Sequence, residues 1–114
     1  MMRHKVVLVP FPFDDLSSAK VRPAVCLTDS VGVYKHVVLA FITSRVPAEP
    51  LPTDFVIADS DPEFAKTGLR VSSTLQLHRM MTVTTRIIMR ELGELSAGMK
   101  AQVERRLKIL FGIR

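Results

Sequence analysis

The chain has 114 residues, a length that makes one small domain, and 47% of them are hydrophobic. Sixteen Lys and Arg residues against eleven Asp and Glu residues give a formal net charge of +5, which favours a polyanionic partner. A single cysteine excludes an intrachain disulfide and a thiolate metal cage. No run of about 18 apolar residues and no signal-peptide pattern occurs, so we expect one domain, residues 1–114, in the reducing cytoplasm and not in a membrane.

The first part of the chain predicts a long β-hairpin. Two apolar runs, Val6 to Val9 and Ala24 to Leu27, are short and bounded by proline or polar residues, which favours strands over helices. Prolines, aspartates and serines fill the segment between them and predict a loop. At its end Arg22 precedes Pro23, which pushes Arg22 towards an extended conformation at the start of the second strand. Its guanidinium is a planar, permanently charged group suited to binding a phosphate.

The middle of the chain predicts two further strands. Tyr34 to Ser44 is almost wholly apolar from Val37 to Ile42, as expected for a central strand covered on both sides in a small closed barrel. Val46 to Pro52 contains three prolines and is therefore predicted to be a loop. Thr53 to Ala58 predicts a short strand after it.

The next segment predicts a short helix and more extended chain. Ser60 as a capping residue and Pro62 as a first-turn residue predict a helix that Gly68 ends after one or two turns. Leu69 to Gln76 and Leu77 to Val83 are predicted to be extended, although polar and apolar residues alternate imperfectly there. The pattern from Thr84 to Leu95 is ambiguous between strand and helix.

The last segment predicts an amphipathic helix capped by Ser96. Its apolar positions are spaced as one buried face and comprise Met99, Val103, Leu107, Leu110 and Phe111. The chain is thus predicted to be mainly β, with five to seven short strands and a C-terminal helix. Because the hydrophobic content is high for so small a chain, we expect a homodimer that buries part of this surface.

Four stretches together carry a resemblance to a known family. They read VVLVPFPFDDL from Val6, KVRPAVCLT from Lys20, FITSR from Phe41, and TLQLHRMMTVTTRIIMRELGELS from Thr74. In this order they resemble the MazF/PemK toxins of type II toxin-antitoxin systems, which are endoribonucleases. The resemblance covers nearly the whole chain. It implies an SH3-like β-barrel of the MazF/PemK/CcdB kind, a last strand near Ile88 to Leu95, single-stranded RNA as substrate, and a cognate antitoxin protein as partner.

The resemblance also implies two catalytic residues, Arg22 and Thr43. In such enzymes the ribose 2′-OH attacks the adjacent phosphorus and leaves a 2′,3′-cyclic phosphate. This reaction needs hydrogen-bond donors and positive charge around the phosphate but no obligatory metal. The sequence has no Asp, Glu and His cluster at metal-ligand spacing, so we expect metal-independent catalysis without a cofactor. On the residues alone, Arg22 is equally consistent with a surface arginine that bridges to Asp14 or Asp15.

Further candidate RNA-binding residues flank these two: Lys20, Ser44, Arg45, His78 and Arg79. Each has an ordinary alternative. Residues such as Lys20 and Arg45 are more often solvated charges, and one such as His78 is more often a strand-surface residue, although it is the histidine best placed to act as an acid or base. Phe11 and Phe13 offer rings for base stacking but equally suit packing beneath their loop.

The chain departs from the family pattern in two places. His4 and Lys5 stand where the family usually has Gly-Asp before the first strand, and Met81 stands where many members have an arginine. The arginine is therefore lost or replaced in its role by Arg79. These departures keep two alternatives open: a toxin of the same fold that inhibits DNA gyrase by protein binding, and a barrel that binds nucleic acid without cleaving it.

Overall fold

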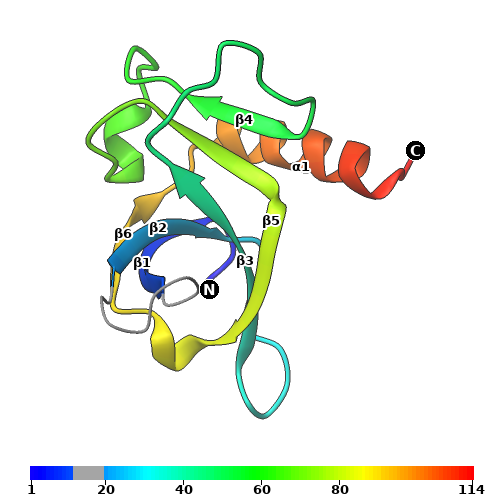
Figure 1. The fold of residues 1–114 in the computed structure, drawn as a ribbon. Coiled ribbons are helices and arrows are strands. Elements are labelled where there is room, and N and C mark those ends of the chain that lie inside the picture. Colours follow the sequence, from blue (N-terminus) through cyan, green and yellow to red (C-terminus); the bar gives the residue numbers. More distant parts are fainter. Residues whose placement is uncertain (12–19) are drawn as a thin grey trace.

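The computed structural model describes residues 1–11 and 20–114, with the side chain of Phe11 excluded (Figure 1). The predicted loop with Asp14 and Asp15, and the proposed roles of Phe11 and Phe13, therefore lie outside the described residues. The strands are β1 (Lys5–Phe11), β2 (Lys20–Cys26), β3 (His36–Thr43), β4 (Asp54–Ile57), β5 (Ser73–Thr84) and β6 (Arg90–Glu94). Two 3₁₀-helices, η1 (Phe64–Thr67) and η2 (Thr85–Ile87), and one α-helix, α1 (Ala97–Phe111), complete the described elements.

The six strands form one antiparallel sheet in the order β4-β5-β3-β2-β1-β6. Figure 1 shows that this sheet is strongly curled and that α1 lies beside β4 and β5. The predicted hairpin is confirmed, since β1 pairs with β2 and Val7 lies opposite Ala24. The predicted fold class, mainly β with a C-terminal helix, is confirmed as well.

Both faces of the curled sheet are buried, which explains the apolar run in β3. Ala40 and Ile42 point into one cluster of buried residues, which also takes up Met99 and Val103 of α1. Leu39 and Phe41 point into a second cluster on the other face. A strand buried on both sides carries apolar residues at successive positions, as predicted for this central strand.

A large irregularity interrupts the pairing of β5 with β3. Ala40 lies opposite Met80, but its neighbour Phe41 lies opposite Gln76, so residues 77–79 have no partners on β3. Such a bulge bends the strand and changes which side chains face each side of the sheet. It also explains the imperfect alternation in the sequence, because a strict period of two holds only within each half of β5.

The 3₁₀-helix η1 packs closely against β6 through glycines. A Cβ atom built on Gly93 would lie 2.1 Å from the carbonyl oxygen of Lys66, and one on Gly68 would lie 2.2 Å from the carbonyl oxygen of Leu92. Gly68 has a left-handed φ of 74° and ends η1, as predicted. The helix begins only at Phe64, however, and the Ser60 side chain does not cap it, contrary to prediction.

Helix α1 begins as predicted and differs at its end. The Ser96 hydroxyl oxygen accepts a hydrogen bond from the Met99 N–H at 3.2 Å. Met99 and Val103 are buried, but Phe111 is 59% exposed, so its predicted place on the buried face is wrong. The reason is that α1 extends beyond the short strand β4 on which it packs (Figure 1).

The turn before β1 forms although it lacks the usual Gly-Asp pair. The Lys5 N–H donates to the Met2 carbonyl at 3.0 Å, and His4 takes a left-handed φ of 72°. Both backbone groups of His4 form hydrogen bonds. Its N–H donates to the Cys26 carbonyl, and its carbonyl accepts from the Leu95 N–H. Burial, helped by Lys100 and Arg3, lowers the pKa of the His4 imidazole below its ordinary value.

The tight contact between η1 and β6 predicts that Gly93→Ala is destabilising. The added methyl group would overlap backbone atoms, which cannot rotate away as a side chain can. We therefore expect the free energy of unfolding to fall by about 1–3 kcal/mol. Gly98→Ala is the matched control, because a Cβ there meets no atom within 4 Å and a helix favours Ala over Gly. Urea unfolding checks both variants, and equal stability of the two would contradict this packing.

The lowered pKa of His4 predicts a loss of stability in mild acid. The unfolded chain takes up a proton near the ordinary pKa of 6.5, whereas the folded chain takes it up only at lower pH, so acid favours unfolding. We expect the melting temperature to fall between about pH 7.5 and about pH 5.5. His4→Asn, which tolerates the left-handed φ, should reduce this slope. His36→Asn, at an exposed histidine, is the matched control variant.

Candidate functional site

A pocket of about 540 Å³ opens where β2, β3 and β5 lie side by side. Its lining residues are Arg22, Phe41, Ile42, Thr43, Ser44, Arg45, Gln76 and Arg79. It therefore brings together five of the seven residues that the sequence singles out, and they come from segments far apart in the chain. Phe41 and Ile42, which are both buried, are its apolar lining residues.

The strand register explains why Arg22 and Thr43 meet. Ala24 of β2 lies opposite Phe41 of β3, and both belong to the same buried cluster. Side chains two residues apart in a strand point to the same face. Arg22 and Thr43, each two residues beyond that pair, therefore continue the same face to the point where the apolar core ends.

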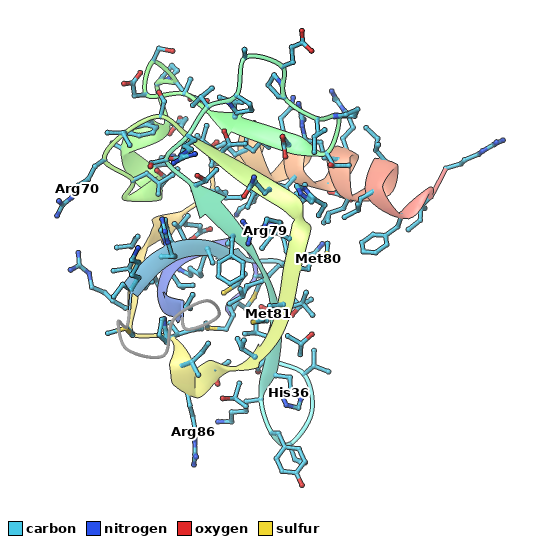
Figure 2. All side chains as sticks on the ribbon, in the orientation of Figure 1. His36, Arg70, Arg79, Met80, Met81 and Arg86 are labelled. Carbon is cyan, nitrogen blue, oxygen red and sulfur yellow. The ribbon has the colours of Figure 1, made fainter. Side chains whose placement is uncertain are left out.

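The bulge in β5 brings Arg79 to the same pocket. Gln76 and Arg79 are three residues apart, and in a regular strand such residues point to opposite faces. Because residues 77–79 are unpaired, the alternation changes phase and both side chains line the pocket. In Figure 2, Arg79 is labelled beside the crossing of β3 and β5, whereas Arg86 extends away from the lower end of the sheet.

Hydrogen bonds fix the chain where it leaves β3. The Arg45 N–H donates to the Thr43 hydroxyl oxygen at 3.2 Å, and the buried Thr74 hydroxyl donates to the Arg45 carbonyl at 2.8 Å. Thr43 and Thr74 lie directly opposite each other in the sheet. Within the described part of the chain no group accepts the Thr43 hydroxyl proton, so it can be donated to a ligand in the pocket.

The pocket is electrostatically positive. Three arginines, Arg22, Arg45 and Arg79, line it, and among the described residues no Asp or Glu does. Guanidinium groups and hydroxyl donors around an open pocket suit an anion such as a phosphodiester. The described residues contain no group of three or more His, Cys, Asp or Glu side chains that could hold a metal ion.

Two predicted residues lie outside this lining. Lys20 is exposed at the first position of β2. His78 lies in the bulge, and its Nδ1 is 3.9 Å from Oδ1 of Asp54, a carboxylate oxygen that is buried without a hydrogen-bond partner among the described residues. Oδ2 of the same carboxylate accepts the Leu51 N–H, so Asp54 fixes the chain ahead of β4.

Gln76 was not among the residues that the sequence singled out. It lies opposite Phe41 on β3 and Asp54 on β4, and its amide can both donate to and accept from a ligand. In the sequence, Gln76 continues an alternating pattern of polar residues with Ser72 and Thr74, which marks one face of an extended segment. Only the bulge in the structure shows that Gln76 shares a face with Arg79.

Met81 and Cys26 are core residues. Met81 lies opposite Leu39 and packs against the second buried cluster, which explains why an apolar residue suits this position. Arg79, two residues earlier, is the arginine of this segment that reaches the pocket. Cys26 is buried, and burial raises the pKa of its thiol to about 11, so it is a structural residue and not a nucleophile.

The family follows from comparison with known proteins. Residues 2–111 match the model of the PemK-like, MazF-like toxins of type II toxin-antitoxin systems. The chain therefore belongs to this family. A search of curated proteins found no match.

Within the described residues, α1 is too short and too polar to cross a bilayer.

Solved structures share the fold at low sequence identity. The toxin MazF-mt6 of Mycobacterium tuberculosis is similar with a TM-score of 0.73 and 20% identity, over 96% of this chain and 98% of that chain. A mycobacterial endoribonuclease in complex with its cognate antitoxin has a TM-score of 0.73 and 14% identity, over 100% and 97%. In MazE-MazF of Deinococcus radiodurans the TM-score is 0.73 and the identity 21%, over 100% and 98%.

Proposed function

We propose that this protein is a metal-independent endoribonuclease that cuts single-stranded RNA, and that it acts as the toxin of a type II toxin-antitoxin pair. The observation that supports this most is the meeting of Arg22 and Thr43 in one open, positively charged pocket. The family and the similarity to a solved mycobacterial endoribonuclease support it as well.

The pocket offers positive charge and hydrogen-bond donors for the phosphate in phosphodiester cleavage. The ribose 2′-oxygen attacks phosphorus and loses its proton to solvent water, and the bond from phosphorus to the 5′-oxygen breaks as that oxygen gains a proton from solvent water. The products are a 2′,3′-cyclic phosphate and a 5′-hydroxyl. Arg22 and Arg79 would stabilise the charge that accumulates on the non-bridging oxygens, and the Thr43 hydroxyl would donate to one of them.

The partner we propose is an antitoxin that covers the pocket. Two of the similar structures are complexes of MazE with MazF, and another is a complex with a cognate antitoxin. A positive pocket favours an acidic partner segment that replaces the RNA phosphates.

The gyrase alternative rested on the two departures from the family pattern. Both have structural explanations, because His4 makes the turn before β1 and Arg79 brings an arginine to the pocket. We therefore favour the nuclease over the gyrase inhibitor. A DNA supercoiling assay distinguishes the two.

Cleavage of a long RNA in EDTA tests the function. The wild-type protein should cut it, and Arg22→Ala or Thr43→Ala should each lower the rate by about 10²-fold or more, as loss of a transition-state donor does in other enzymes. Arg86→Ala removes a charge outside the pocket and should retain the rate. Intact RNA with the wild-type protein, or inhibited supercoiling without cleavage, would overturn the proposal.

We also propose a homodimer that uses the end of α1. Ile109, Phe111 and Ile113 are each more than half exposed, an apolar surface that favours burial against a second copy. Phe111→Asp should therefore lower the solution mass measured by light scattering towards that of a monomer. Tyr34→Asp, at another exposed ring, should not change it. A monomeric wild-type protein at micromolar concentration would contradict the proposal.

A further inference from the structure

A second pocket adjoins the first. It has a volume of about 320 Å³ and shares Arg22, Ile42 and Ser44 with the first pocket. Its other walls come partly from β2 and the first residue of β5, and partly from β1, β6 and the segment between η1 and β5, which do not contribute to the first pocket. A ligand that fills the first pocket can therefore extend past Arg22 into the second without leaving the surface.

The second pocket is also positively charged. Arg22, Arg70 and Arg90 line it, and no acidic side chain from residues 1–11 or 20–114 does. Arg70 and Arg90 are exposed, and their guanidinium groups make no hydrogen bond or ion pair with the described residues. Figure 2 shows Arg70 extending outward from the segment after η1.

The walls between these arginines are apolar. They comprise Leu8, Val21, Pro23, Leu69, Val71 and Leu92. Apolar surface bordered by guanidinium groups is what an unstacked nucleobase and its phosphate need, since the base stacks on flat or apolar side chains and the phosphate accepts from arginine. The volume lies at the lower end of the roughly 300–1,000 Å³ of ligand pockets.

The segment that carries Arg70 and Val71 is held in place. Gly68 packs against the Leu92 backbone so closely that no side chain fits between them. The Ser73 hydroxyl donates to the Val71 carbonyl at 2.8 Å, and the Asp59 N–H donates to the Ser72 hydroxyl oxygen at 2.8 Å. A wall fixed in this way can discriminate between bases, because it cannot adjust to each of them.

We propose that the second pocket binds the nucleotide next to the cleaved phosphodiester, with its base between Leu69, Val71 and Leu92 and its phosphate on Arg70 and Arg90. This inference rests on the proposed function, because it assigns the neighbouring nucleotide of the same RNA. Residues outside the first pocket would then select the base at one position beside the cleaved bond.

A binding assay that needs no cleavage tests the phosphate contacts. The probe is a fluorescent 12-residue RNA of random sequence in which every 2′-OH is methylated, so that no attack can occur. The double variant R70Q/R90Q should bind it more weakly, and the slope of log affinity against log salt should become shallower by about 0.7 for each lost phosphate contact. The control R86Q/R105Q makes the same charge change at exposed residues outside both pockets and should retain the wild-type slope.

A cleavage assay tests the base contact. Val71→Trp fills the second pocket, and it should raise the KM for RNA and change the base preference at one position beside the cut, mapped by sequencing product ends, with little change in kcat. Val33→Trp, on the exposed loop between β2 and β3, is the control. If R70Q/R90Q matches R86Q/R105Q and Val71→Trp matches wild type, the second pocket does not bind RNA.

The two proposals fail in different ways. If the wild-type protein binds the methylated RNA but does not cut unmodified RNA, the nuclease proposal is wrong, and the salt slopes still decide whether Arg70 and Arg90 contact phosphates. If the wild-type protein cuts RNA and neither set of variants changes binding or base preference, only the second-pocket proposal is wrong.

Discussion

The register of β3 between β2 and β5 is the constraint on which the site depends. Ala24 opposite Phe41 sets where Arg22 and Thr43 lie, and the bulge opposite Ala40 and Phe41 sets where Gln76 and Arg79 lie. A slip by one residue would turn each strand's side chains to the other face and exchange the core with the pocket. Burial of both faces makes such a slip costly, so the stability of the core also fixes the geometry of the site.

Charges are separated over the surface of this basic protein. Glu94 pairs with Lys100 at 2.9 Å and with Lys5 at 3.2 Å, and these hydrogen bonds lower the pKa of its carboxyl group. Lys5 also pairs with Glu91. Exposed ion pairs of this kind add little to stability. Their effect here is that Glu91 and Glu94 offset the charge of nearby lysines. In the part of the chain that the structure describes, arginines line the two adjoining pockets without a carboxylate, so the positive potential of these residues concentrates there.

The sequence predicted the fold well because its strongest signals are local. The hairpin, the doubly buried strand around Val37 to Ile42 and the helix capped by Ser96 all depend on patterns within a few residues. It was wrong where the partner element decides the outcome. Phe111 fits the periodicity of a buried face, but β4 is too short to cover it, and Ser60 fits a cap although the helix begins only at Phe64.

The sequence by itself predicted which residues would carry the proposed chemistry: Arg22 and Thr43 through their resemblance to the family's motifs, and a preference for a polyanion through the net charge. Only the tertiary structure decided which of the other candidates join them. It places Arg79 in the pocket, His78 beside Asp54, and Gln76 among residues that the sequence did not connect with it. The physical reason is the bulge in β5, which changes the phase of side-chain alternation and which no local pattern of residues reveals.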